Sequence, residues 1–220
     1  MPPPTLPRLD RPILIVCEGR DDERFLVAML SALGVTTPFL VEFVEGAGKL
    51  GDYILAVRRR PGFQNVRAFA VIRDADNDAA AAFASVRGFL ADSGYPVPAR
   101  SGQLGQGGIN GAALTVGVFI MPDGAQPGAL EDLYLAALTD DPSLACVNAF
   151  LDCTAPHAPM EPSQRSKAQI HAWLASRREP AIRLAQALND HYVSPWHPAF
   201  GPIRAFLQQL AAAPPDRPTA

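Results

Sequence analysis

The sequence predicts an α/β fold in which a mostly parallel sheet is flanked by helices and followed by a helical C-terminal extension. Two features indicate this class. Several apolar runs have the length and continuity of strands buried on both faces, and amphipathic helical patterns separate these runs. Such alternation is typical of parallel sheets with right-handed crossovers. With 220 residues, 48% of them hydrophobic, the chain can build one substantial core.

The first strand–helix unit is the clearest one. Ile13–Cys17 form a continuous apolar run, which predicts a buried strand. Glu18 then begins a turn, and Asp21 or Asp22 is expected to cap the next helix. Gly34 is expected to end that helix. Its apolar stripe has three-to-four spacing and consists of Phe25, Met29, Leu30 and Leu33.

Further strands and helices are predicted to alternate along the chain in the same way. Strands are predicted within residues 38–46, 66–74 and 114–124, and helices within residues 48–60, 79–90 and 126–138. The glycine-rich stretch 99–112 has neither Walker A nor GxGxxG spacing, so a surface connection is favoured over a mobile loop near a site.

The chain is predicted to hold one α/β domain, residues 12–142, with a helical extension, residues 143–210, packed on it. No long linker separates the two parts. The extension is assigned from four helical patterns, at residues 142–153, 163–177, 181–192 and 202–210. The proline-rich ends, residues 1–11 and 211–220, are expected to be disordered tails.

Composition narrows the classes of function. No apolar run approaches the roughly 20 residues that a membrane helix needs, and no signal pattern begins the chain. Three cysteines without CxxC spacing, Cys17, Cys146 and Cys153, are expected to be reduced, packed thiols in a cytoplasmic protein. A net charge of −3 argues against a broad nucleic-acid coat, but not against an acidic site that handles nucleic acid through metal ions. The basic stretch at residues 57–67 is interpreted as a helix end, with phosphate contact as the alternative.

Acidic residues follow three of the predicted strands. Glu18 follows the first strand, Asp74 and Asp76 the third, and Asp123 the fourth. In an open α/β sheet ligands bind outside the carboxyl ends of the strands, so these acids are expected to lie at one edge. Carboxylates that close repel one another unless cations lie among them. Oxygen ligands point to Mg²⁺, with Mn²⁺ as a second option.

Ordinary capping and turn chemistry is the alternative for acids of this kind. It is favoured for Asp21, Asp22 and Asp78, each of which stands near a predicted helix start. Glu131 and Asp132 fit either a metal site or a favourable interaction with the dipole of their helix. For Glu18, Asp74 and Asp76 taken together, the metal site is favoured. The four histidines lack metal-ligand spacing and are interpreted as structural or surface residues.

The segments "LIVCEGRDDERFL" and "FAVIRDADND" resemble the two signature motifs of Toprim domains, a Glu-Gly turn after strand one and an Asp-x-Asp after a later strand. The chain resembles more closely a small bacterial family of Toprim-like proteins related to the Toprim domain of the OLD (overcoming-lysogenization-defect) nucleases. Counterparts there include "FIMPDGAQPGALEDLYL" and "KAQIHAWLASRREPAIRLAQAL". The resemblance covers about residues 12 to 210 and implies a Toprim-like, Rossmannoid sheet.

The resemblance also implies roles for individual residues. Glu18 would be a metal ligand or general acid/base, and Asp74 and Asp76 would bind Mg²⁺. The OLD-type site adds later acids and a lysine, for which Asp123, Glu131 and Lys167 are the candidates; a solvent-facing helix residue is the alternative for Lys167. A counterpart of the OLD ATPase domain is not found in these residues, which leaves activation, substrate loading and oligomeric state open.

Three functions remain. The first is Mg²⁺-dependent, nuclease-like phosphodiester chemistry on DNA or RNA, in which one or two metals and Lys167 would stabilise the transition state. The second is a non-catalytic Toprim-like module that binds a protein partner or a nucleic-acid end, in phage defence or repair. A small-molecule phosphohydrolase ranks last. In haloacid-dehalogenase-like enzymes the Asp-x-Asp motif normally follows the first strand, whereas here it follows the third.

Overall fold

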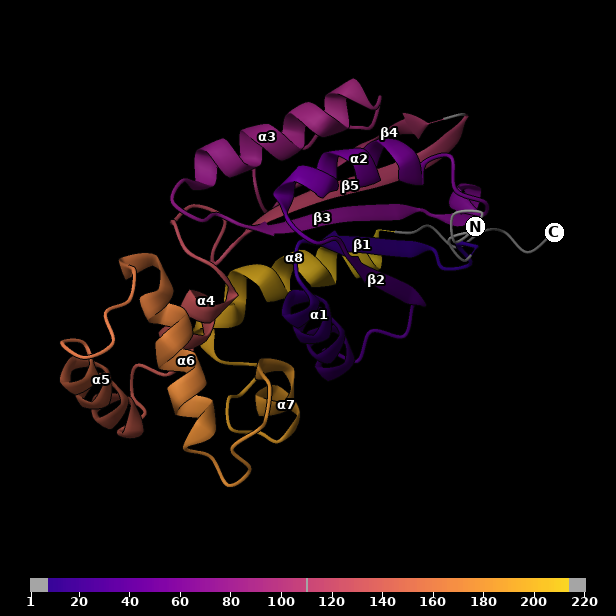
Figure 1. Ribbon diagram of the computed structural model, residues 1–220. Coiled ribbons are helices and arrows are strands. Elements are labelled where there is room, and N and C mark those ends of the chain that lie inside the picture. The colour runs from indigo at the N-terminus through magenta and orange to yellow at the C-terminus, as the bar shows by residue number, and fades with distance from the viewer. Residues whose placement is uncertain (1–7, 110, 214–220) are drawn as a thin grey trace, which may run out of the picture.

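The computed structural model describes residues 8–109 and 111–213, and its centre is a five-stranded sheet in the order β2-β1-β3-β5-β4 (Figure 1). Strands β2, β1, β3 and β5 run parallel to one another, and the edge strand β4 is antiparallel to β5. The strands are β1 (Ile13–Cys17), β2 (Phe39–Phe43), β3 (Ala68–Asp74), β4 (Leu104–Ile109) and β5 (Ala112–Met121). The predicted α/β class with a mostly parallel sheet is therefore confirmed.

The predicted helices are also present. Those of the sheet region are α1 (Arg20–Ala32), α2 (Ala47–Val57), α3 (Ala79–Asp92) and α4 (Leu130–Ala137). The C-terminal part contains α5 (Ser143–Thr154), α6 (Arg165–Ala175), α7 (Leu184–Asn189) and α8 (Gly201–Ala212). As expected, α1 ends just before Gly34, which adopts a φ of 65° that favours glycine.

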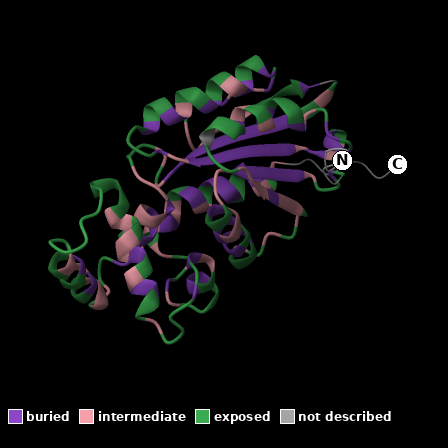
Figure 2. Cartoon of the chain, in the orientation of Figure 1, coloured by how far each residue is buried: buried purple, intermediate pink, exposed green. Residues whose placement is uncertain are grey.

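The sheet separates two hydrophobic cores because successive strand residues point to opposite faces. Ile13 and Ile15 of β1 face the core that contains α1 and α8, whereas Leu14 and Val16 face the core under α2 and α3. Figure 1 shows α2 and α3 on one side of the sheet and α1 and α8 on the other. The central strands are buried and the outward sides of the helices are exposed (Figure 2).

The helical extension shares the α1-side core. Helices α4 to α7 gather at one end of the sheet, and α8 then returns along its face (Figure 1). The ring of Phe206 on α8 lies 5.4 Å from that of Phe119 on β5. The ring of Phe200, just before α8, lies 5.9 Å from that of Phe25 on α1. The extension and the sheet are therefore packed together by aromatic contacts rather than joined by a free linker.

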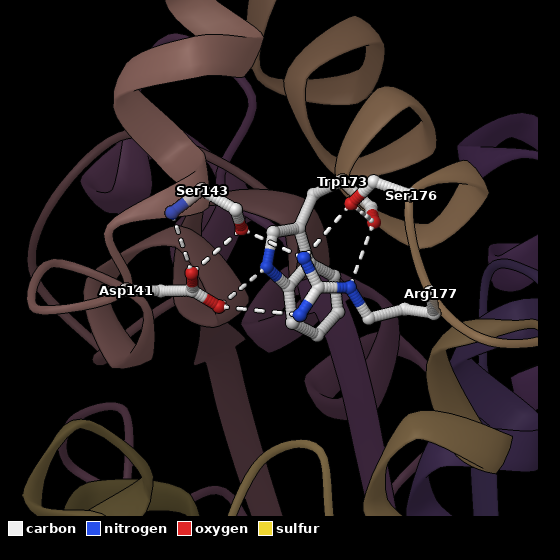
Figure 3. Close-up of polar contacts among 5 residues, drawn as sticks. All are labelled: Asp141, Ser143, Trp173, Ser176 and Arg177. Carbon is white, nitrogen blue, oxygen red and sulfur yellow. Dashed lines mark hydrogen bonds and ion pairs between the residues drawn. The ribbon is translucent and has the colours of Figure 1, made fainter.

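A polar cluster joins the start of α5 to the end of α6 (Figure 3). The Asp141 carboxylate accepts hydrogen bonds from the indole N–H of Trp173 at 2.8 Å and from the hydroxyl of Ser143 at 2.6 Å. Arg177 completes the cluster, with Nη1 3.6 Å from the carboxylate and its guanidinium carbon 4.5 Å from the centre of the Trp173 ring. Trp173 is fully buried, so Asp141 satisfies its indole N–H in the interior.

Replacing Asp141 with Ala is expected to lower the free energy of unfolding by about 1.5–3 kcal/mol, because it leaves the Trp173 N–H without a partner. Burial pushes the pKa of Asp141 upward, but bonds from Ser143 and Trp173 and the charge of Arg177 outweigh it and lower the pKa. The contribution of Asp141 is therefore present above the unfolded pKa and is lost as the pH falls through the lower folded pKa. Urea unfolding of wild type and variant at several acidic pH values measures this loss, and Asp152→Ala, an exposed acid on α5, is the control.

The glycine-rich stretch corrects the prediction of a plain connection, because it forms the edge strand β4. Its glycines make it look unlike a strand, yet two of them are required by close packing. A Cβ on Gly105 would lie 3.0 Å from the backbone of Val97 and Pro98, and one on Gly107 would lie 2.9 Å from the Pro96 ring. The segment between α3 and β4 therefore crosses β4 too closely for larger residues.

The ends of the chain and two cysteines differ from expectation. Leu9 falls within the predicted N-terminal tail, but it is 1% exposed and its N–H donates to the carbonyl of Pro61 at 2.8 Å. At the other end α8 continues to Ala212, whereas residues 1–7 and 214–220 of the predicted tails lie outside the described residues. Cys17 is buried as predicted, but Cys146 and Cys153 are exposed rather than packed.

The basic stretch is largely committed to structural contacts. Nη1 of Arg60 lies 2.6 Å from the Glu42 carboxylate, which Tyr53 also contacts, and Arg58 donates to the carbonyl of Ser93. These contacts support a role at a helix end rather than phosphate contact. In the described part of the chain no helix is long and apolar enough to cross a membrane.

Candidate functional site

The parallel strands bring the predicted acids to one edge of the sheet. Cys17, at the end of β1, pairs in register with Ile72 of β3, and Asp74, at the end of β3, pairs with Met121 of β5. The carboxyl ends of the three central strands are therefore nearly level. Glu18 follows β1 directly, so it lies at the same edge as Asp74.

A backbone bridge ties the loop after β3 to the loop after β5. The N–H of Asp76 donates to the carbonyl of Gly128 at 3.1 Å, and the N–H of Gly128 donates back at 2.8 Å. Asp76 adopts a left-handed φ of 53°, which is uncommon outside glycine. Since α4 begins just after Gly128, the bridge sets the position of Glu131 relative to the Asp-x-Asp motif.

The start of α4 is fixed by Asp132, for which the sequence predicts either a metal site or a favourable interaction with the dipole of its helix. Its Oδ2 accepts from the N–H of Ala129 at 2.8 Å, and its Oδ1 accepts from the hydroxyl of Ser166 on α6 at 2.5 Å. Asp132 thus has a capping role. Glu131 is left to face the other acids.

Five carboxylates form what we call the acidic cluster: Glu18, Asp22, Asp74, Asp76 and Glu131. Burial, and then the charges of Asp22 and Glu131, raise the pKa of Asp74 from 3.8 to about 9. Burial, and then the charges of Glu131 and Glu18, raise the pKa of Asp22 to about 7. Keeping these carboxylates buried and close together costs free energy, and strongly shifted pKa values of this kind are typical of functional sites.

Asp22 is the residue that the sequence assigned to capping but that the structure places in the acidic cluster. It lies in the first turn of α1 and is 7% exposed. A hydrogen bond with the Gly19 backbone opposes the rise in its pKa, so Asp22 also helps to hold the helix start. The signal in the sequence was its spacing from Glu18. Asp22 lies four residues later, and the loop and the first helical turn between them bring its side chain back to the end of the strand.

Of the other two acids predicted to cap helices, Asp78 does so and Asp21 does not, because α1 begins at Arg20 with Gly19 as its N-cap. Asp78 caps α3, since its Oδ1 accepts from the N–H of Ala81 at 2.9 Å. Asp21 is exposed and pairs with Arg24 and Arg183 at 3.3 and 3.5 Å.

Two basic side chains contact the acidic cluster. Arg73 was not singled out in the sequence; its Nε lies 3.4 Å from Oε1 of Glu18 and its Nη2 3.6 Å from Oδ2 of Asp76. Burial raises the pKa of Glu18, and the charge of Arg73 opposes that rise. The sequence candidate Lys167 lies on α6, and its Nζ is 3.8 Å from Oε1 of Glu131 with the side chain 58% exposed.

Asp123 is set apart from the acidic cluster. It is exposed, and its Oδ1 accepts from the N–H groups of Ala125 and Gln126 at 2.9 and 2.8 Å. It also lines an open pocket of about 390 Å³ with Arg100 and Ser101. The structure therefore gives Asp123 a turn-forming role and does not bring it together with Asp74.

The acidic cluster fits a divalent cation in its charge and chemistry. Oε1 of Glu18 and Oδ1 of Asp74 are buried without a hydrogen-bond partner, and Oε1 of Glu18 is engaged by the ion pair with Arg73 at 3.4 Å. The buried Asp74 oxygen lacks even a hydrogen bond, which is costly. Oxygen donors without nitrogen or sulfur suit Mg²⁺ or Mn²⁺. Among the described residues, however, no group of three Asp, Glu, His or Cys side chains is arranged so that it could hold a metal ion. The charge of the site is thus in place, whereas its coordination geometry is not preformed.

Comparison with known proteins identifies a family for this chain but finds no similar curated protein or solved structure. Residues 12–212 match the family described as protein of unknown function (DUF3226). The match spans most of the 220 residues, and the chain belongs to the DUF3226 family.

Proposed function

We propose that this protein is a Toprim-like, Mg²⁺-dependent enzyme that cleaves phosphodiester bonds in DNA or RNA. One observation carries the proposal. Glu18 and Asp22 of the β1–α1 turn, Asp74 and Glu131 come from three separate segments and gather near the carboxyl edge of the sheet, where burial and mutual repulsion raise the pKa of Asp74 to about 9. Such an arrangement is stable in its charged form only with a cation. The resemblance of the Glu-Gly and Asp-x-Asp motifs to Toprim domains supports the same function.

Each residue has a chemical role in this proposal. Asp22, Asp74 and Glu131 would hold the cation, which would be Mg²⁺ or Mn²⁺. When bound, the metal supplies charge that stabilises a phosphate undergoing substitution and lowers the pKa of a bound water. The buried Oε1 of Glu18 accepts no hydrogen bond and lies 3.4 Å from Arg73, and burial raises the pKa of Glu18, which suits the transfer of a proton.

Lys167 would contact the substrate rather than the metal. Its amine is mostly exposed and is held by a single ion pair of 3.8 Å with Glu131, so it can turn toward a phosphate at little cost. A lysine there would stabilise the negative charge that develops on the leaving oxygen. The cytoplasmic location expected from the free cysteines belongs to the same proposal.

The purified protein is expected to cleave plasmid, single-stranded DNA or RNA when Mg²⁺ or Mn²⁺ is added. Asp74→Ala combined with Asp76→Ala should lower the rate at least about a hundredfold, because the metal would lose Asp74 as a ligand and the acidic cluster would lose a second carboxylate. Asp78→Asn is the matched control from the same loop, since Asn caps a helix as well as Asp does. Gel assays of all three proteins measure the effect. Cleavage that persists in the double variant would exclude this site as its source.

A non-catalytic binding module is the second candidate. It is favoured by three ion pairs, which already engage Glu18, Asp76 and Glu131, and by the absence of a three-ligand group among the described residues. In that case calorimetry with millimolar Mg²⁺ should show no binding, and the protein should instead bind nucleic-acid ends or a protein partner. Hydrolysis of a small phosphate ester without action on nucleic acid would point to the third possibility, a phosphohydrolase.

A further inference from the structure

We propose that Arg73 stands in the place of a second cation, so that the acidic cluster takes one divalent ion rather than two. This inference rests on the proposed function and assigns the stoichiometry of its metal site. It also makes Arg73 a positioning residue, which holds Glu18 and Asp76 without contacting the substrate.

Strand geometry directs Arg73 and Asp74 to opposite faces of the sheet. On β3, Ile72 belongs to the core on the α1 side and Val71 to the core under α2 and α3. By the same alternation Asp74 points to the α1 side, and Arg73 points to the α2 and α3 side. The electrostatic neighbours agree, because the carboxylate with the largest effect on Asp74 is Asp22 of α1.

Arg73 is held firmly in place. Its side chain is 9% exposed, and its Nε donates to the backbone carbonyl of Asp74 at 3.3 Å. The same nitrogen lies 3.4 Å from Glu18, and Nη2 lies 3.6 Å from Asp76. A guanidinium cannot lose its proton in a protein, so this charge is permanent. Asp76 is also fixed through its backbone bridge to Gly128, so the two acids and the arginine form a constructed unit.

A divalent ion between Glu18 and Asp76 would therefore lie beside a buried positive charge. The side chains of Arg73 and Glu18 are 9% and 14% exposed, so repulsion between like charges is strong on the Glu18 side, whereas the Asp76 side chain is 69% exposed. The other flank of the cluster, formed by Asp22, Asp74 and Glu131, differs, because its basic neighbour Lys167 contacts Glu131 through an exposed amine that can move away. The structure thus favours one external ion, on the α1 flank, and an internal cation on the other flank.

Titration of the full-length chain with Mn²⁺ tests this stoichiometry, with calorimetry counting the ions and electron paramagnetic resonance detecting coupled pairs. Wild type is expected to bind one ion and to show no Mn–Mn coupling. Two ions with coupling would overturn the inference but leave the proposed function standing. No bound ion would overturn the proposed function, and this inference with it.

Variants at Arg73 test the cause. Arg73→Gln is expected to bind a second Mn²⁺, because it frees Glu18 and Asp76, whereas Arg73→Lys should still bind one. A single ion in Arg73→Gln would overturn the inference. Arg73→Gln leaves two acids unpaired, so the double variant Arg73→Gln with Glu18→Gln is included to remove one of these charges. The double variant should bind one ion. Two ions there would count against the inference. The wild-type count decides the question even if Arg73→Gln does not fold.

Discussion

Replacing Asp74 with Asn is expected to raise the melting temperature of the metal-free protein at about pH 8 while it abolishes stabilisation by Mn²⁺. The carboxylate is buried beside Asp22 and Glu131. Its burial, and then the charges of these two residues, raise the pKa of Asp74 to about 9. An amide of the same shape removes the repulsion and needs no proton. A gain of about 1–2 kcal/mol would appear as a rise of roughly 2–8 °C in a chain of this size.

The dependence on pH has a definite sign. The folded pKa of Asp74, about 9, lies above its ordinary value of 3.8. The folded state therefore holds a proton that the unfolded state releases, and the free energy of unfolding falls as the pH rises between these values. Asp22, with a folded pKa of about 7, acts in the same direction. Metal-free wild type should thus lose stability from about pH 5 to pH 9, and Asp74→Asn should lose less.

Addition of Mn²⁺ reverses the order of the two proteins. A ligand that binds the folded state alone stabilises it by mass action, so wild type at about pH 8 should gain several degrees in a thermal shift assay. Asp74→Asn should gain little, and the control Asp78→Asn should gain as much as wild type. Equal shifts in all three proteins would mean that Mn²⁺ binds elsewhere, and a metal-free Asp74→Asn less stable than wild type would contradict the electrostatic account.

The architecture could be predicted because the strongest patterns in the sequence reflect burial. The apolar runs that became β1, β3 and β5 are buried on both faces, so no polar alternation obscures them. The edge strand β4 was missed for the opposite reason. Its glycines lower strand propensity, but Gly105 and Gly107 are required by the chain that crosses them, and that contact cannot be read from local sequence.

The candidate site was predictable where position along a strand determines position in space. Glu18 and Asp74 follow neighbouring strands, so the rule for parallel sheets places them together. Asp123 also follows such a strand, yet its carboxylate is drawn into a tight turn by two backbone N–H groups. Arg73 and Asp22 were missed because their roles depend on side-chain direction, which is set by strand alternation and by the first turn of α1.

Replacing Gly128 with Ala is expected to lower the free energy of unfolding by about 2–4 kcal/mol and to weaken Mn²⁺ binding together with it. Gly128 adopts a φ of 130°, which other residues rarely adopt, and an added Cβ would lie 2.8 Å from Oδ2 of Asp132. The substitution would therefore disturb the cap of α4, which positions Glu131, and the backbone bridge that fixes Asp76. Urea unfolding measures the first effect and Mn²⁺ calorimetry the second.

Gly88→Ala is the matched control for this substitution. Gly88 lies within α3, and an added Cβ there meets nothing within 4 Å, so Ala should raise stability by about 0.5–1 kcal/mol. A Gly128→Ala protein with normal Mn²⁺ affinity but reduced stability would show that α4 is not needed to complete the site. Loss of both properties would instead mean that the link between the loops after β3 and β5 holds the acids at one edge.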